Sequence, residues 1–281
     1  MFPRRLFVAS LLLGAVAPAA PSPAKLALVK PVFRGYDGGP AAAPGTSFNT
    51  GDTVFFNCQV EGYQVSQENK VQLRYTLEAV DPGGVPIAEA GQREINTEVS
   101  PEDKNWRPLL TESVLVPPLA FGGQYRIRVR VEDQLSHQSA QSEYAFTVRG
   151  KQLEPGDNVT ARNFRFLHAE DDQNAMLNPV YHPGEPLWAR FDIVGFHYGA
   201  KNRIHVEYGI AVLNAEGKPL FTQPNAAVEE GESFYPKRYL GGALSLNLDK
   251  NVRPGSYAIL LTLRDEVGGQ TSESTHPFRV E

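Results

Sequence analysis

Apolar side chains occupy every second position in many short segments of this chain. Two of the clearest segments are residues 73–77 and 127–131, where polar side chains fill the positions between the apolar ones. A period of two is the pattern of a β-strand with one buried face and one solvated face. The apolar members are Leu73, Tyr75, Leu77, Ile127, Val129 and Val131, and the polar positions on the alternate face include Gln72, Arg74, Thr76, Arg126, Arg128 and Arg130. No segment shows a sustained period of 3.6 residues with a helix cap, so we expect no long helix.

The second half of the chain repeats the first. Placing Gly51 on Gly184 aligns two long blocks without a gap, and placing Gly123 on Gly255 aligns the C-terminal part of each half after a slip of one residue. The matched pairs include Gly62 with Gly195, Tyr75 with Tyr208, Ile87 with Leu220, Tyr125 with Tyr257, Asp133 with Asp265, and Gln138 with Gln270. So many matches in one register indicate an internal duplication.

Each half holds about seven predicted strands. They lie near residues 26–33, 53–61, 70–80, 85–91, 110–116, 124–133 and 142–149, and near 159–168, 186–194, 203–213, 218–223, 243–248, 256–265 and 274–281. Turn residues separate them, notably Asp81-Pro82-Gly83-Gly84 and Asn214-Ala215-Glu216-Gly217. Seven short strands in a unit of roughly 120 residues are typical of a Greek-key β-sandwich. We therefore predict an all-β protein built from two tandem sandwiches.

The last two strands of each half carry a further signature. Tyr125 opens a long alternating strand within the segment 119–131, and Tyr257 does so within 248–263. This arrangement resembles the tyrosine corner of immunoglobulin and fibronectin type III modules. The resemblance implies tandem immunoglobulin-like sandwiches of the kind found in bacterial extracellular proteins. The sequence lacks the Cys, Trp, Cys framework of antibody domains.

The predicted organisation is a signal peptide at residues 1–24, a first sandwich at 25–150, a linker at 151–157 and a second sandwich at 158–281. The linker is polar and bounded by Pro and Gly, and its shortness indicates limited motion between the sandwiches.

The N-terminal segment has the features of a secretory signal. A basic start at Arg4-Arg5 precedes a short apolar run from Leu6 to Ala17, and small residues lead to a cleavage site after Ala24. Cuts after Ala17 or Ala20 would leave proline as the first mature residue. The apolar run is too short to cross a bilayer, which takes about 20 residues. We expect an exported protein, periplasmic or extracellular, without a membrane span in its mature part.

Charge and cysteine content narrow the range of partners. The net charge of −5 is spread without long runs, so we expect no nucleic-acid partner. The single cysteine, Cys58, rules out an intrachain disulfide and leaves a reactive thiol, an intermolecular bridge or a buried core residue. The duplication places Phe191 on Cys58 and Trp188 on Phe55. We interpret both pairs as core positions and expect Cys58 to be inert.

The sequence carries none of the common catalytic motifs. The sequence contains no G-x-S-x-G or H-E-x-x-H string and no Gly-rich phosphate loop, so we expect neither an enzyme nor a cofactor. Among the histidines of the second half, His168, His182, His197 and His205 leave a metal-binding role open. The acidic run Glu170-Asp171-Asp172 offers too few oxygen ligands for calcium, and we interpret it as a solvated loop.

Two loops at equivalent positions carry aromatic and basic side chains that the shared strand pattern does not require. They are residues 104–107 and 234–239. Aromatic and arginine side chains are enriched where partners bind. The candidate partner-binding residues are Trp106, Arg107, Phe234, Tyr235, Lys237, Arg238 and Tyr239. The alternative is that each loop folds back over the end of its own sandwich.

These observations favour a non-enzymatic exported protein that binds or spaces other molecules, as an adhesion, scaffold or carbohydrate- or protein-contact module. Its partner would be a protein or a polysaccharide at the cell surface or in the periplasm. Two alternatives stay open, namely an accessory substrate-binding subunit of a secreted hydrolase and a periplasmic metal-handling protein. Fold alone does not choose among them.

Overall fold

A computed structural model describes residues 25–103 and 105–281. The signal peptide predicted for residues 1–24 lies outside this range, as does Lys104. In the first half the strands are β1 (Ala27–Arg34), β2 (Ser47–Asn49), β3 (Thr53–Glu61), β4 (Lys70–Val80), β5 (Gly91–Glu98), β6 (Leu109–Leu115), β7 (Gly123–Asp133) and β8 (Ser139–Arg149). In the second half they are β9 (Thr160–Leu167), β10 (Val180–Tyr181), β11 (Pro186–Val194), β12 (Ile204–Asn214), β13 (Pro219–Gly231), β14 (Leu240–Asn247), β15 (Gly255–Asp265) and β16 (Gln270–Val280).

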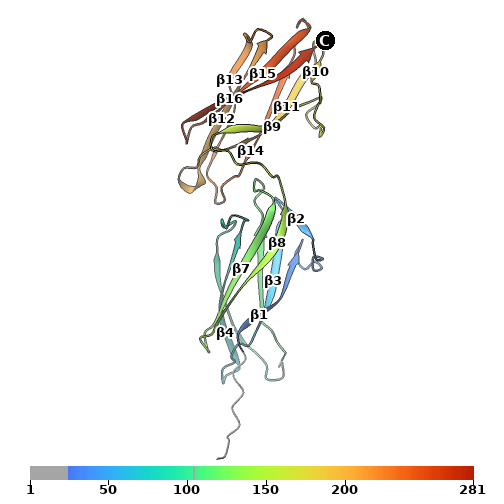
Figure 1. Ribbon diagram of the computed structural model, residues 1–281. Helices are drawn as coiled ribbons and strands as arrows, with labels where there is room; N and C mark the ends of the chain where they lie inside the picture. The colour runs from blue at the N-terminus through green and yellow to red at the C-terminus, as the bar shows by residue number, and fades with distance from the viewer. Residues whose placement is uncertain (1–24, 104) are drawn as a thin grey trace, which may run out of the picture.

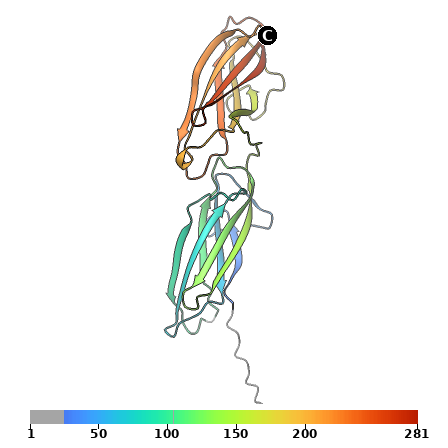
Figure 2. The same cartoon turned by 60° about the vertical axis from the view of Figure 1, so that its left-hand side comes forward.

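The strands form two sandwiches of the same topology. Sandwich 1 pairs the sheet β1-β3-β6 with the sheet β2-β8-β7-β4-β5, and sandwich 2 pairs β9-β11-β14 with β10-β16-β15-β12-β13. Every strand of sandwich 2 therefore has its counterpart in sandwich 1. The short strand β2 pairs in parallel with β8, and β10 pairs in parallel with β16. The other strand pairs are antiparallel. Figures 1 and 2 show the two sandwiches stacked end to end. The predicted all-β class with tandem sandwiches is confirmed.

Helical structure is minimal in the part of the chain that the structure describes. It consists of one 3₁₀ turn, η1 (Ala200–Asn202), as the absence of a 3.6-residue period predicted. No helix among the described residues has the length and apolar character to cross a bilayer.

The cores lie where the alternating pattern places them, with one correction. Cys58 is fully buried, and burial raises the pKa of its thiol to about 12, so the thiol stays protonated and unreactive. Phe191, its counterpart, is also buried. Phe55 and Trp188 are half-buried and project from the opposite face of their strands, so their assignment to the core was wrong. Strand β3 has bulky apolar residues on both faces, and the sequence alone does not show which face points inward.

Strand boundaries differ from the prediction mainly next to β4. The strand expected at 85–91 forms only a bridge between Val80 and Pro86, and β5 begins at Gly91. Residues 85–87 stay hydrogen-bonded to the end of β4, with Ile87 in the core, and the pairing is interrupted at 88–90. In sandwich 2 the corresponding segment stays in the ladder, so β13 is much longer than predicted. The short strands β2 and β10 were not predicted, because two or three residues form a strand only against an existing edge.

Equivalent hydrogen bonds in the two sandwiches agree with the duplication at atomic detail. The hydroxyl of Tyr125 donates to the carbonyl of Phe121 at 2.8 Å, and that of Tyr257 donates to the carbonyl of Arg253 at 2.8 Å. This is the tyrosine corner that the resemblance implied. In addition, the side-chain oxygen of Gln138 accepts from the backbone of Leu26, and that of Gln270 accepts from Val159.

Candidate functional site: the junction between the sandwiches

The aromatic and basic loop between β13 and β14 lies against sandwich 1. Tyr235 is 7 % exposed and Tyr239 is 6 % exposed. The ring of Tyr235 packs into the core of sandwich 1, and Leu119 of sandwich 1 packs against the core of sandwich 2. We call this contact the junction. It comprises Asp81, Leu119, Phe121 and Lys151 on one side and Asp192, Tyr235, Arg238 and Tyr239 on the other.

A buried carboxylate anchors the junction. Asp81, in the turn after β4, is 3 % exposed, and its Oδ2 accepts hydrogen bonds from the Tyr235 hydroxyl at 2.9 Å and from Arg238 Nη2 at 2.6 Å. Arg238 Nε also donates to the Tyr235 hydroxyl at 3.0 Å. The other carboxylate oxygen accepts from the backbone N–H of Val85 at 2.8 Å. The buried charge is thus paired and fully hydrogen-bonded, as burial requires.

The local electrostatics favour the ionised carboxylate. Burial opposes ionisation of Asp81, but hydrogen bonds from Val85, Arg238 and Tyr235 outweigh it and hold the pKa of Asp81 below its usual value. Burial raises the pKa of Tyr235, so its hydroxyl stays a donor. Burial alone would lower the pKa of Arg238, but its hydrogen bonds to Tyr235 and Asp81 raise it. The three groups therefore keep complementary protonation states at neutral pH.

We expect the junction to weaken in acid. Because the pKa of Asp81 is lower in the docked state than in the free carboxyl, its contribution is complete above the free value of about 3.9 and is lost as the pH falls below it. Interdomain order, measured by small-angle X-ray scattering from pH 7 to pH 3, should fall below about pH 4. The Asp81→Asn variant, which has no carboxyl to titrate there, should lack this step. An identical step in the variant would contradict the assignment.

A second set of contacts reinforces the anchor. The rings of Phe121 and Tyr239 stack with centroids 6.2 Å apart. Lys151 lies with its ammonium 4.8 Å from the centre of the Tyr239 ring and pairs with the buried Asp192. The backbone N–H of Arg238 donates to the carbonyl of Leu119 at 2.9 Å. The first residue of the predicted linker is thereby attached to sandwich 2.

The remaining candidates in this loop lie beside the junction. Lys237 pairs with Glu229 at 2.5 Å, and its carbonyl accepts from the Tyr198 hydroxyl at 2.6 Å. Phe234 is 53 % exposed. The loop therefore divides into buried residues that contact sandwich 1 and an exposed phenylalanine at its side.

Trp106 and Arg107 lie at the far end of sandwich 1. Because the sandwiches stack end to end, Trp106 and Arg107 face away from the junction, although they are equivalent to residues in the loop 234–239. The carbonyl of Trp106 accepts from the Tyr63 hydroxyl at 2.7 Å, and the two rings meet edge to face at 6.0 Å. Arg107 pairs with Glu61 at 2.7 Å. Both side chains are half-buried over their own sandwich.

Asp81, Leu119, Lys151 and Asp192 of the junction were not predicted as site residues. One signal in the sequence could have indicated the first of them. The turns 81–84 and 214–217 are equivalent, and a carboxylate at Asp81 stands where the second copy has the neutral Asn214. A charge at a position where the copies otherwise agree points to a role that only one copy performs.

Two histidines of sandwich 2 each lie beside a carboxylate, and they do not form a cluster with one another. His197 Nδ1 lies 3.0 Å from a carboxylate oxygen of Asp265, and His205 Nε2 lies 3.2 Å from one of Glu207. Among the described residues there is no group of three or more His, Cys, Asp or Glu side chains placed to hold a metal ion.

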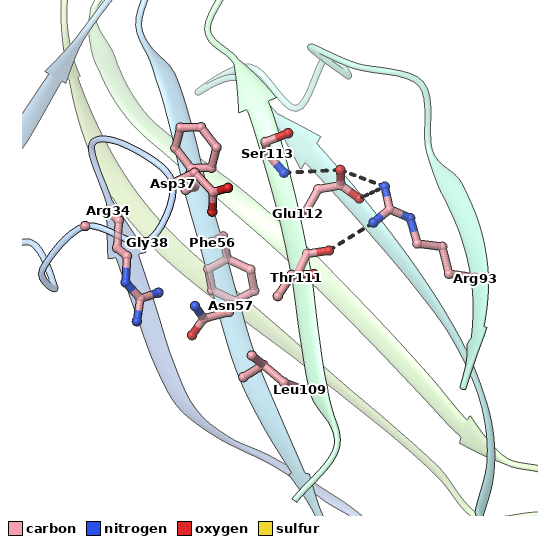
Figure 3. Close-up of a pocket in the computed structure, with 12 residues that line it drawn as sticks. Arg34, Asp37, Gly38, Phe56, Asn57, Arg93, Leu109, Thr111, Glu112 and Ser113 are labelled. Carbon is pink, nitrogen blue, oxygen red and sulfur yellow. Dashed lines mark hydrogen bonds and ion pairs between the residues drawn. The ribbon is translucent and has the colours of Figure 1, made fainter. Parts of the chain in front are cut away.

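A polar hollow of about 480 Å³ lies on the β1-β3-β6 face of sandwich 1. Figure 3 shows Arg34 and Asp37 on one side of it and Arg93 and Glu112 on the other. Arg93 extends from β5 to β6, pairs there with Glu112 at 2.9 Å and donates to the carbonyl of Thr111 at 3.1 Å. The hollow presents both charge signs to solvent and provides donors and acceptors for a polar ligand.

Comparisons with known proteins identify no family. No protein-family model matches this sequence, and no curated protein matches it. Among solved structures, the C-terminal domain of the AgI/II polypeptide BspA of Streptococcus agalactiae matches with 10 % identity and a TM-score of 0.31, covering 89 % of this chain and 100 % of that one. A family 123 glycoside hydrolase from Clostridium perfringens matches with 12 % identity and a TM-score of 0.31, covering 44 % of this chain and 27 % of that one. Similarity at this level assigns no function.

Proposed function

We propose that this chain is a non-enzymatic exported binding or structural protein that holds two sandwiches as one elongated unit and contacts a partner protein or polysaccharide with its outer surfaces. The junction is the observation that carries the proposal. It places a buried ion pair, a stacked aromatic pair and a lysine on an aromatic face between two bodies that each have a core of their own.

Such a junction suits a spacer or presenting module. Contacts between domains of one chain commonly permit relative motion, and a buried, satisfied carboxylate at the contact opposes it. Surfaces on the two sandwiches then keep a fixed relative orientation. This lowers the conformational entropy that is lost when a partner contacts both sandwiches. The exposed Phe234, the half-buried Trp106 and Arg107, and the polar hollow are the contact surfaces of this proposal.

The Asp81→Asn variant tests the junction without disturbing its turn. In the equivalent turn of sandwich 2, Asn214 Oδ1 accepts from Lys218 N–H at 2.8 Å, as Asp81 accepts from Val85, so asparagine supports this turn. The variant loses the charge that Tyr235 and Arg238 contact, which weakens docking by about 2 kcal/mol. Nitrogen-15 relaxation should show a single tumbling time for both sandwiches in the native protein and shorter, separate times in the variant.

Asn214→Asp is the matched control. It makes the reverse exchange at the same turn of sandwich 2, far from the junction, and should leave the common tumbling time unchanged. If Asp81→Asn also left the tumbling time unchanged, the proposal of one rigid unit would fail. Both variants should keep the thermal unfolding of their own sandwich within about 1 kcal/mol of native.

A further inference from the structure

An apolar pocket opens at the end of sandwich 2 that lies away from sandwich 1. It has a volume of about 400 Å³ and lies between the two sheets, at their edge strands β13 and β14. Its apolar wall is formed by Val212, Leu220, Phe221, Leu246, Tyr257 and Phe278. Ser245, Asn247 and Asp249 contribute polar groups. A mainly apolar pocket with a few polar groups at its edge is the usual form of a binding site.

Sandwich 1 shows the same place closed. Ile87 is 5 % exposed, whereas its counterpart Leu220 is 58 % exposed, and the adjacent Phe221 is 45 % exposed. Tyr125 is fully buried, whereas Tyr257 is half-buried. The backbone explains the difference. In sandwich 1 the N–H of Ile87 donates to the carbonyl of Ala79, and Ile87 points into the core. In sandwich 2 the register shifts between Val212 and Leu213, so Phe221 instead of Leu220 pairs with Val212, and both side chains stay at the surface.

The same end of sandwich 1 also receives a ring from outside. Tyr235 of sandwich 2 packs there into the core of sandwich 1 and bonds to the turn at Asp81. The equivalent turn of sandwich 2 begins at Asn214 and lies at the pocket end, next to Val212. This end of the fold therefore accepts an aromatic side chain from a neighbouring loop once in this molecule, and the second copy of it is open.

We propose that the pocket between β13 and β14 binds an aromatic side chain, phenylalanine or tyrosine, carried by a loop of a partner polypeptide. The neutral Asn214 replaces the carboxylate that holds Arg238 in the junction, and its Oδ1 already accepts from the N–H groups of Glu216 and Lys218. Recognition therefore rests on burial of the ring rather than on an ion pair. Aromatic anchors in apolar pockets contribute a large share of the energy of many interfaces.

Capped pentapeptides test the site directly. Gly-Gly-Phe-Gly-Gly, the same peptide with alanine at its centre, and decanoate would be titrated into the full mature chain, followed by the methyl NMR signals of Val212 and Leu246. The phenylalanine peptide should shift both signals saturably, and the alanine peptide should not. Tighter binding of decanoate would overturn the proposal in favour of an acyl-chain site, and the absence of a shift with the phenylalanine peptide would overturn it outright.

Two variants locate the binding. Val212→Phe fills the pocket and should weaken binding of the phenylalanine peptide about tenfold. Phe221→Ser removes an exposed wall residue without a cost to the core and should also weaken binding, by about fivefold, since most of its apolar contact area with the ring is lost. Val228→Ser is the control, because Val228 is 52 % exposed on the same strand and is not part of the pocket wall. Equal binding by Phe221→Ser and Val228→Ser would overturn the assignment. The site is independent of the junction, and Asp81→Asn should bind the peptide as the native chain does.

Discussion

Asp133→Ala is expected to lower the free energy of unfolding of sandwich 1 by about 3–4 kcal/mol, because it leaves several donors without an acceptor. The Asp133 carboxylate is fully buried and accepts from Gln64 N–H at 2.7 Å, Leu135 N–H at 3.0 Å and Ser136 Oγ at 2.6 Å. These bonds join the turn after β7 to the loop after β3. Urea unfolding followed by circular dichroism measures the loss.

The duplicate residue provides a second measurement. Asp265 is 1 % exposed and accepts from His197 N–H at 2.8 Å, from Val267 N–H at 3.1 Å and from Gly268 N–H at 3.0 Å. Asp265→Ala should destabilise sandwich 2 by a similar amount. Glu68→Ala serves as the control because the Glu68 side chain is 75 % exposed, and its effect should stay within about 0.5 kcal/mol. Native stability in either aspartate variant would refute the role of these carboxylates.

Gly195→Ala is expected to cost sandwich 2 about 3 kcal/mol or more. Gly195 has φ of +76°, and an added Cβ would lie 2.1 Å from the carbonyl oxygen of Asn158, which is backbone and has little room to move. Gly62 in sandwich 1 has φ of +74° and a Cβ position 2.3 Å from the carbonyl oxygen of Lys25. Alanine at either position adds a backbone collision to the strain of a left-handed conformation. Differential scanning calorimetry should resolve the lowered transition.

Gly217→Ala separates the strain of a left-handed conformation from the backbone collision. Gly217 has φ of +77°, nearly that of Gly195, but no atom lies within 4 Å of the added Cβ. Its replacement should cost only the conformational strain, about 1 kcal/mol. If Gly217→Ala and Gly195→Ala lowered the transition equally, the close approach of the Lys25 and Asn158 carbonyls would not be the reason for glycine at positions 62 and 195.

Much of the fold could be predicted because its signals are local. The period of two in β4 and β7 places Leu73 and Val129 in the core and Arg74 and Arg128 outside, where the arginines pair with Glu94 and Glu143. The duplication also aligned Asp133 with Asp265, which are both buried and accept backbone hydrogen bonds. The face of Phe55 and Trp188 and the path of residues 85–90 could not be predicted in this way, because each depends on what the opposite sheet presents.

The candidate site shows the same division. Aromatic and basic residues at 104–107 and 234–239 were identified from the sequence, since the shared strand pattern does not require them. Their environment was not, because two loops of similar composition lie at opposite ends of sandwich 1, one at the junction and one facing away. Asp81 and Lys151, distant in sequence from Tyr235 and Tyr239, become their neighbours only when the sandwiches stack.

The sequence by itself determined most of the strands, the repeat and the all-β class, since alternation and internal similarity are properties of neighbouring residues and of matched positions along one chain. Only the tertiary structure decided in which duplicated pairs one member is buried and the other is exposed. Tyr125 is covered by sandwich 2 and Tyr257 is not, and Ile87 is packed inside while Leu220 faces solvent. Burial depends on what lies opposite, and the same end of the two sandwiches has different surroundings: it meets sandwich 2 at the junction in sandwich 1, and it is open in sandwich 2.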